Sequence, residues 1–222
     1  MAGLKIVAQP SIEPISVVEA REHLRLDDDV DKSQIMSYII ATREWAENYT
    51  GRHFISRTMQ MFLDGATQVD NPLWEGMRTG IDVIDYNNYI EFPVSPVQSV
   101  SSIKYYNDSD VVAVWNTTNY YVDIVSQPAK IVLRTGGTYP TDLRPANGLE
   151  INFTSGYGSN ITDVPEAIRV AMLQYLTFMY EHRGDYDKDV KEPTIIQSLL
   201  NPYRILSFNS NAYDKMFKSG IS

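Results

Sequence analysis

The residues that could perform catalysis or hold a metal ion are few and widely separated in this chain of 222 residues. The three histidines, His23, His53 and His182, do not form a pair four residues apart of the kind that binds zinc on one helix face. There is no cysteine, which excludes a thiol nucleophile, a thiolate metal site and a disulfide framework. These patterns favour solvated or helix-end histidines over metal ligands.

Acidic residues offer the remaining catalytic chemistry. Glu91, Asp123 and Glu150 lie in or beside predicted strands, where two converging carboxyl groups could act as acid and base. The sequence does not show that any two converge, and scattered surface carboxylates are the simpler interpretation. The stretch Gly156-Tyr-Gly158 has two of the three glycines of a dinucleotide-binding loop but lacks the third. We therefore expect no enzymatic activity, no metal and no bound cofactor.

A run of aspartates, Asp27, Asp28, Asp29 and Asp31, is the densest group of charge in the chain. Read as a calcium-binding loop from its first aspartate, the run lacks the glycine at the sixth position and the glutamate at the twelfth. Helix capping is the favoured interpretation, because Asp31 followed by Gln34 forms a capping box for the next helix.

The composition is typical of a soluble globular protein, with 43% hydrophobic and 21% charged residues. A formal net charge of −9 disfavours a surface that grips nucleic acid, because phosphate binding needs a concentrated positive field. No segment approaches the ~20 apolar residues of a membrane span. The N-terminus also lacks the basic start and apolar run of a signal peptide. We expect a protein made in the cytosol that does not bind membranes.

The helix predicted over residues 163–183 is the longest uninterrupted element, and the other elements must position it. Pro165 lies in its first turn, Gly184 follows its last turn, and Asp163 is expected to cap its free amides. Its apolar residues cover a wider arc than one core requires. Two interpretations remain open: a central helix within a single fold, or a helix that also packs on another subunit.

Periodicity and turn signals predict the remaining elements. Helices are expected over residues 17–24, 32–49 and 193–200, and strands over residues 58–64, 89–92, 97–106, 111–115, 120–125, 130–134 and 149–153. No helical stretch separates these strands, so the sheet should be mostly antiparallel. Three segments show no regular pattern: an extended arm at 1–14, a long loop at 65–88 and a tail from 208 onward.

We therefore predict an α+β fold with a helical core, an inserted and mostly antiparallel β subdomain, and an extended C-terminal tail. The helical core would contain an antiparallel helix hairpin, the long central helix and a short C-terminal helix. The predicted boundaries are 1–55 for the N-terminal helices, 56–160 for the β subdomain, 161–206 for the closing helices and 207–222 for the tail.

Two pairs of adjacent tyrosines, Tyr105-Tyr106 and Tyr120-Tyr121, place one ring on each face of their predicted strands. One ring of each pair should belong to the core. The other could belong to a glycan-binding surface or to a subunit contact, and the sequence does not choose between them.

Short motifs in a fixed order along residues 12–204 carry a family resemblance. They are Pro14-Ile-Ser-Val-Val-Glu-Ala-Arg-Glu-His-Leu-Arg-Leu-Asp27, Ala46-Glu-Asn-Tyr-Thr-Gly51, Glu91-Phe-Pro-Val-Ser-Pro-Val-Gln-Ser-Val100, Ile103-Lys-Tyr-Tyr106, Tyr120-Tyr-Val-Asp123, Gly156-Tyr-Gly158, Val164-Pro-Glu-Ala-Ile168, Tyr180-Glu-His-Arg183 and Leu199-Leu-Asn-Pro-Tyr-Arg204. In this order they resemble the head–tail connector proteins (adaptor, or head-completion, proteins) of long-tailed bacteriophages. The chain departs from shorter members of that family at residues 65–88 and beyond residue 206.

The resemblance implies a non-enzymatic structural protein of the virion neck, present in the host cytoplasm during assembly. It implies a ring, commonly dodecameric, beneath the portal protein, which extends the DNA channel and offers a platform for a stopper or tail-completion protein. Genomic DNA would pass through without specific binding. The alternative is a β-sheet binding module, recognising a glycan or a protein, in a phage tail or baseplate component.

Three candidate surfaces follow from the resemblance and the residue patterns together. One side of the 163–183 helix is the candidate subunit contact, with Arg169, Val170, Leu173 and Thr177. The tail is the candidate portal-binding segment, with Phe208, Tyr213, Met216 and Phe217. The run Asp27, Asp28, Asp29 and Asp31 is the candidate acidic channel surface, which would repel DNA phosphates.

Overall fold

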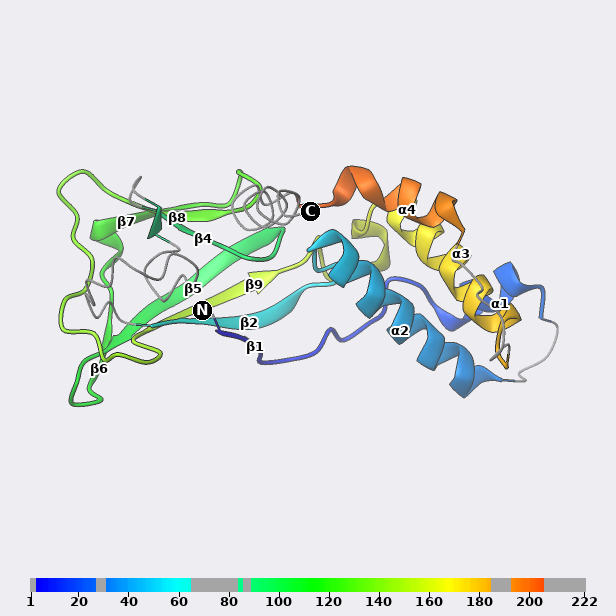
Figure 1. Ribbon diagram of the computed structural model, residues 1–222, viewed down its shortest axis with the longest axis horizontal. Helices are drawn as coiled ribbons and strands as arrows, with labels where there is room; N and C mark the ends of the chain where they lie inside the picture. Colours follow the sequence, from blue (N-terminus) through cyan, green and yellow to red (C-terminus); the bar gives the residue numbers. More distant parts are fainter. Residues whose placement is uncertain (1–2, 27–30, 65–83, 86–88, 185–192, 206–222) are drawn as a thin grey trace, which may run out of the picture.

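A computed structural model describes residues 3–26, 31–64, 84–85, 89–184 and 193–205 of the chain. The molecule is elongated, with the helices gathered at one end and the strands at the other (Figure 1). The predicted α+β class is confirmed. Among the described residues, no helix has the length and apolar character needed to cross a membrane.

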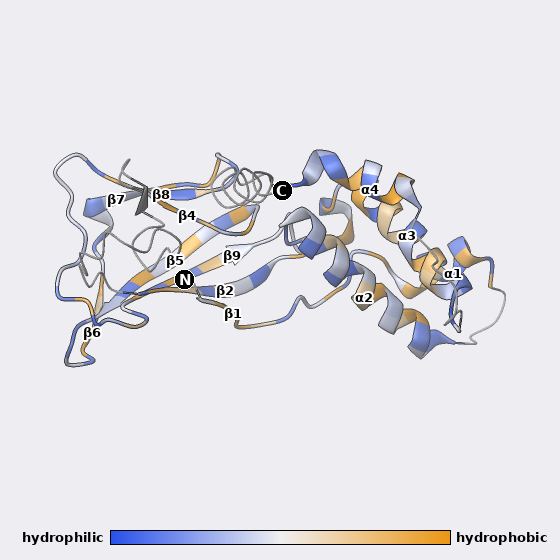
Figure 2. Cartoon of the chain, in the orientation of Figure 1, coloured by the Kyte–Doolittle hydropathy of each residue, from blue (hydrophilic) through white to orange (hydrophobic). Residues whose placement is uncertain are grey.

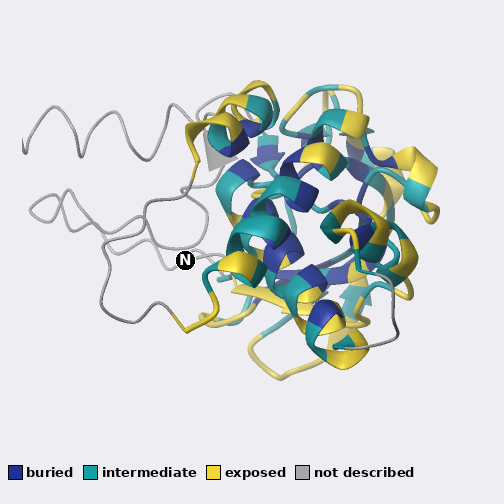
Figure 3. Ribbon diagram, turned by 90° about the vertical axis from the view of Figure 1, so that its right-hand side faces the viewer, coloured by how far each residue is buried: buried dark blue, intermediate teal, exposed yellow. Residues whose placement is uncertain are grey.

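Four helices build the helical end: α1 (Val17–Leu24), α2 (Lys32–Thr50), α3 (Glu166–Glu181) and α4 (Thr194–Leu200). They enclose one hydrophobic cluster to which α2, α3 and α4 all contribute. Its buried members include Ile35, Ile39, Ala46, Phe54, Ile168, Ala171, Met172, Leu176, Ile196 and Leu200. Viewed from this end, the buried residues line the inner sides of the helices and the exposed ones lie outside (Figure 3). The long helix α3 is therefore a central part of the helical core.

Two antiparallel sheets build the other end. The larger sheet has the order β1-β2-β9-β5-β6, formed by β1 (Gly3–Ile6), β2 (Arg57–Leu63), β9 (Leu149–Ser155), β5 (Val97–Tyr106) and β6 (Val112–Val114). The smaller sheet has the order β3-β4-β8-β7, formed by β3 (Ile84–Asp85), β4 (Tyr89–Glu91), β8 (Lys130–Leu133) and β7 (Tyr120–Asp123). Every strand pairing in both sheets is antiparallel, as the short turns between strands predict.

A second hydrophobic cluster lies between the two sheets. Its buried residues come from both: Met59, Met61, Ile103, Ile151 and Phe153 from the larger sheet, and Ile90 and Ile131 from the smaller one. Hydrophobic and hydrophilic residues alternate along β5 and β9, in the middle of the larger sheet (Figure 2). Every second residue of β2, beginning with Thr58, faces away from this cluster and is less buried than its neighbours. The larger sheet therefore has an inner apolar face and an outer, more polar face.

The N-terminal segment differs from the prediction. Residues 1–14 were expected to be irregular, but Gly3–Ile6 forms β1 at the edge of the larger sheet, with Leu4 opposite Met61. All four of its residues are exposed, and the alternation of apolar and polar side chains at Leu4, Lys5 and Ile6 is too short to predict a strand. Within the stretch expected to be a loop, residues 84–85 form β3; residues 65–83 and 86–88 lie outside the described part of the chain.

The expected role of Asp163 as a helix cap is also wrong. Pro165 is the N-cap residue of α3 and has no side-chain cap. The Asp163 carboxylate instead accepts a hydrogen bond from the backbone N–H of Asn160, at 2.8 Å, in the turn before the helix. At the other end of α3, Gly184 has φ +98°, consistent with its predicted role in ending the helix.

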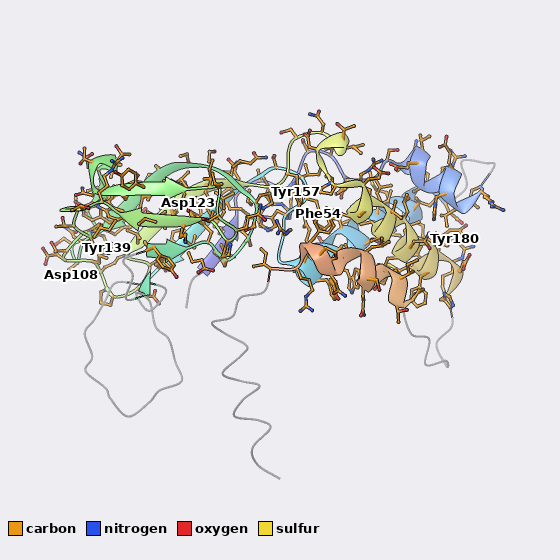
Figure 4. The ribbon with its side chains drawn as sticks, turned by 90° about the horizontal axis from the view of Figure 1, so that it is seen from above. Phe54, Asp108, Asp123, Tyr139, Tyr157 and Tyr180 are labelled. Carbon is orange, nitrogen blue, oxygen red and sulfur yellow. The ribbon has the colours of Figure 1, made fainter. Side chains whose placement is uncertain are left out.

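The Gly156-Tyr-Gly158 motif lies where the chain leaves the sheet for α3. Gly156 has φ +133°, and a Cβ there would lie 2.6 Å from the Ser56 nitrogen. Ser56 donates a backbone hydrogen bond to the Gly158 carbonyl oxygen at 2.8 Å. Because Gly156 has no side chain, its segment can pass close to the segment around Ser56, and both segments connect helices to the sheet. Phe54 and Tyr157 mark this junction (Figure 4).

Candidate interaction surfaces

Four charged side chains are linked at the junction between helices and sheet. The Arg43 Nε atom lies 2.7 Å from Glu13, and another Arg43 nitrogen lies 2.9 Å from Glu47. The second oxygen of Glu47 accepts hydrogen bonds from Arg57 and from the Phe54 backbone N–H. Arg43, Glu47 and Arg57 are all buried. This junction cluster ties the N-terminal arm, α2 and β2 together.

His53 lies beside the junction cluster, where its Nδ1 is 2.5 Å from the Ser155 hydroxyl oxygen. Burial, together with the positive charges of Arg57 and Arg43, lowers the pKa of His53 to about 3. The imidazole is therefore neutral at ordinary pH. His53 differs from the predicted solvated position, because it is half-buried just beyond the end of α2 and its hydrogen-bonding partner, Ser155, is distant in sequence. For His182 the helix-end prediction is confirmed, since its Nδ1 lies 2.8 Å from the Phe178 carbonyl oxygen at the end of α3.

An open cavity of about 330 Å³ lies against the junction, lined by Ile6, Gln9, Arg43, Glu44, Glu47, Asn48, Gly51, His53, Arg57 and Val94. Its charged groups are already paired with one another across the junction cluster. Within the described ranges, no group of three side chains is placed to hold a metal ion.

The three candidate acid–base carboxylates do not converge. Glu150 lies in the larger sheet and accepts a 2.6 Å hydrogen bond from the Tyr106 hydroxyl. Burial raises its pKa, but hydrogen bonds from Tyr106 and Asn152 outweigh burial, so the pKa lies below its ordinary value. Glu91 and Asp123 lie in the smaller sheet, each opposite Lys130 on the strand between them. These positions give structural hydrogen bonds and ion pairs, with no acid–base pair among the three.

The tyrosine pairs divide between the two faces as predicted. Tyr120 is buried in the core between the sheets, and Tyr105 packs against that core. Tyr121 is exposed, with the Arg134 guanidinium 3.6 Å from its ring centre. Tyr106 lies on the outer face, bonded to Glu150, with the Arg144 guanidinium 4.2 Å from its ring centre.

The candidate subunit face of α3 is only partly available to a neighbour. Leu173 is 9% exposed and belongs to the helical core, whereas Val170 is 37% exposed. Arg169 forms ion pairs of 2.5 Å with Glu19 and 2.7 Å with Glu166. Thr177 is half-buried and donates its hydroxyl proton to the Leu173 carbonyl oxygen. Val170 is therefore the member of this set that is free to contact another chain.

Ser16 and Glu19 lie at the start of α1 with the spacing of a capping box. Ser16 does accept a 3.1 Å hydrogen bond from the Glu19 backbone N–H. The Glu19 carboxylate pairs instead with Arg169, which links α1 to α3.

The acidic run is described only at Asp31, because Asp27, Asp28 and Asp29 lie outside the described residues. Asp31 precedes α2 with φ 61° and makes no side-chain cap, so the predicted capping box is wrong. Its carboxylate accepts hydrogen bonds of 3.2 Å from the Tyr180 hydroxyl and from Arg183. Asp31 therefore joins the start of α2 to the end of α3. The predicted tail residues Phe208, Tyr213, Met216 and Phe217 also lie outside the described part of the chain.

A ladder of aromatic rings, which sequence reasoning did not identify as a surface feature, joins α2 and α3. Tyr49 stacks on Trp45 with ring centres 5.5 Å apart, and Trp45 stacks on Tyr175 at 4.2 Å. Tyr175, Phe178 and the His182 ring continue the series at 6.2 and 4.5 Å. All five rings are half-buried. Their spacing of three or four residues within each helix is the sequence signal that could have revealed the ladder.

Comparison with known proteins shows what this chain is similar to. Residues 14–113 match the model of the family described as phage gp6-like head-tail connector proteins. The resemblance to head–tail connector proteins is therefore confirmed over that part of the chain. No curated protein matches the sequence.

Solved structures share the fold over nearly the whole chain. A chain in the neck of an empty GTA particle computed with C6 symmetry has a TM-score of 0.70 at 20% identity, covering 92% of this chain and 96% of that chain. A chain in the virion of a native gene transfer agent (GTA) particle has a TM-score of 0.69 at 21% identity, with coverage of 91% and 95%. A chain in the neck of a native GTA particle computed with C12 symmetry has a TM-score of 0.66 at 21% identity, with coverage of 92% and 96%.

Proposed function

We propose that this protein is a structural head–tail connector that assembles as a ring beneath the portal protein. The ring extends the DNA channel and gives a stopper or tail-completion protein its docking platform. The observation that carries the proposal is the family match over residues 14–113. The shared fold, which covers more than nine-tenths of the length of chains from GTA necks, supports it. The C12 symmetry of one such neck supports a ring of twelve copies for this protein.

The surfaces of the chain suit an assembly protein better than an enzyme. Exposed aliphatic side chains occur on all four helices, where a monomer would gain nothing from them: Val18, Met36, Ile40, Val170 and Ile195. The formal net charge of −9 suits a channel past which DNA slides without binding. His53, Glu150 and His182 each make a structural contact within the chain.

We assign separate roles to the parts of the chain within this proposal. Residues 1–55 and 161–206 form the connector domain, residues 56–160 form an inserted β subdomain, and the tail at 207–222 reaches the portal protein. The acidic run at 27–31 contributes to the channel surface. The protein is located in the virion neck after assembly in the host cytoplasm.

The direct test mixes purified protein with filled capsids that carry a portal vertex. Matched capsids assembled without portal protein are the control. A connector binds once per capsid, at the portal vertex, and electron cryomicroscopy of the bound particles shows a ring there. Equal binding to both kinds of capsid, or no binding to either, contradicts the proposal. Binding to a bacterial surface glycan in place of the capsid would instead indicate the β-sheet binding module.

A further inference from the structure

The two edges of the larger sheet are exposed, apolar and differently built. On one edge, β6 carries Val112 and Val114, which are 51% and 66% exposed, and none of its residues is charged or proline. On the other edge, β1 carries Leu4 and Ile6, which are 43% and 42% exposed. Natural sheets usually protect exposed edges with charges, prolines or bulges, because a bare edge pairs with other chains. An unprotected edge such as β6 indicates a partner strand.

We propose that β6 of one copy pairs in parallel with β1 of the next copy, so that the larger sheets join around the ring. The proposal rests on the ring assembly proposed above and names its contact. Two different edges that bind head to tail form a heterologous interface, and such an interface closes into a ring when the rotation between copies permits it.

Strand direction agrees with parallel pairing. Each of the steps β1-β2, β2-β9, β9-β5 and β5-β6 is antiparallel, so β1 and β6 run in the same direction. In a ring, every copy is related to the next by rotation alone. When the ring axis runs along the strands, rotation about it places the larger sheets of neighbouring copies side by side. β6 of one copy then lies beside β1 of the next copy, and the two strands are parallel.

Among the described residues, the backbone groups on both edges have no hydrogen-bonding partner at matching positions. Asn107 donates to the Val111 carbonyl, and Trp115 donates to the Ile103 carbonyl, so the odd-numbered residues of this segment face β5. The N–H and C=O groups of Val112 and Val114 consequently face outward. On β1, Val7 donates to the Thr58 carbonyl, so the groups that face outward belong to Leu4 and Ile6.

The two faces of the sheet also agree. Val114 lies opposite Lys104 and Lys5 lies opposite Gln60, both on the outer polar face. With Val114 opposite Lys5 of the next copy, the Val114 N–H meets the Leu4 carbonyl and the Ile6 N–H meets the Val114 carbonyl. Antiparallel pairing would put Val114 opposite Leu4 or Ile6, whose side chains lie on the inner face. The next copy would then have to be turned over, which rotation around a ring does not allow.

Introduced cysteines test this contact directly, because the natural chain has no cysteine. The double variant K5C/V114C is assembled on portal-bearing capsids and oxidised under mild conditions. Opposed residues on paired strands lie within the Cα separation that a disulfide spans. We expect a ladder of covalent dimers, trimers and higher oligomers under non-reducing electrophoresis. A mixture of the K5C and V114C single variants should stop at dimers, since each chain then carries one half of the pair.

The control is K5C/V18C. Val18 has nearly the same exposed fraction as Val114, 63% against 66%, but it lies on α1 at the helical end. An equal ladder from this control contradicts the proposal, as does dimer formation by V114C alone, which would indicate β6 pairing with itself. A ring seen by electron cryomicroscopy without cross-linked K5C/V114C overturns the edge contact and leaves the connector function standing. Absence of both ring and portal binding overturns the proposed function itself.

A backbone variant gives an independent readout. Val114→Pro removes an N–H that faces the free edge and so breaks no hydrogen bond within the sheet. We expect the thermal midpoint of the monomer to be retained and ring formation to be lost. Val114→Ala keeps the N–H and should still assemble. Rings formed by Val114→Pro as readily as by the natural chain would contradict the proposed pairing.

Discussion

At the scale of single residues, the junction cluster shows how charged groups can be buried without loss of the fold. Glu47 places one oxygen on Arg43 and the other on Arg57 and the Phe54 N–H. Each charge is therefore compensated within hydrogen-bonding distance. The cluster joins three segments that are separate in sequence, so it fixes how the helices meet the sheet.

Removing the central carboxylate should destabilise the protein strongly. Glu47→Ala leaves Arg43 and Arg57 buried without their shared partner, and we expect the free energy of unfolding to fall by roughly 3–5 kcal/mol. Urea unfolding measures the loss. The matched control is Glu44→Ala on the same helix, whose carboxylate is 59% exposed and 3.7 Å from Arg43. That change should cost about 0–1 kcal/mol, and equal losses in the two variants would contradict a structural role for the cluster.

His53 should make stability depend on pH in one direction. Its pKa is about 3 in the folded protein, against an ordinary value of 6.5. Between these values the unfolded chain binds the extra proton, so stability falls as pH falls below 6.5 and is constant above it as far as this group is concerned. Urea unfolding at about pH 7.5 and at pH 5 measures this effect. Between these two pH values, the free energy of unfolding of His53→Gln should fall by up to about 2 kcal/mol less than that of the natural chain. The same pH dependence in both proteins would contradict this assignment.

At the scale of elements, the helical core accounts for most of the wide apolar arc of α3, and packing of this helix on another subunit stays a prediction. Most of the arc is used within the chain: Leu173 packs in the helical core, and Trp45 of α2 stacks on Tyr175. A smaller part, around Val170, remains exposed. The helix is therefore mainly a core element with a narrow strip that can contact a neighbour.

Separate substitutions on α3 distinguish core from contact. Leu173→Asp should unfold the monomer, because it buries a charge without a partner. Val170→Asp should leave the thermal midpoint nearly unchanged and weaken assembly of the ring on portal-bearing capsids. Thermal unfolding followed by circular dichroism, together with capsid binding, measures both effects. Unfolding by Val170→Asp would show that this residue, too, belongs to the core.

At the scale of the whole molecule, the contacts of Ile205 mark where the helical end is complete. Ile205 is the last described residue; its N–H donates to the Thr50 carbonyl and its side chain packs against the Gly51 backbone. The helical end is thus closed before the tail begins. The tail can be removed without breaking any contact described here.

Deletion of residues 206–222 should therefore leave the thermal midpoint unchanged and reduce binding to portal-bearing capsids. The expected loss follows from the proposed portal contact of the tail residues. Thermal unfolding and co-sedimentation with capsids measure the two effects, with the full chain as reference. Loss of soluble protein on deletion would show that the tail belongs to the fold.

The sequence by itself determined the elements whose signals are local. Alternation along 58–64 and helical periodicity along 32–49 follow from which face each element buries. The order of the short motifs was sufficient to show the family resemblance. The aspects of the molecule that were predictable are those in which neighbouring residues decide the conformation.

Only the tertiary structure decided which charges and edges meet. Asp31 was expected to cap α2, but Tyr180 and Arg183 of a distant segment bind it. Glu19 pairs with Arg169, and His53 contacts Ser155 of β9. The alternation in β1 covers only Leu4, Lys5 and Ile6, so its place at the sheet edge depends on pairing with the backbone of β2. A polar group binds the partner that the fold brings within reach. The spacing of two residues along the sequence does not determine how far apart they lie in space.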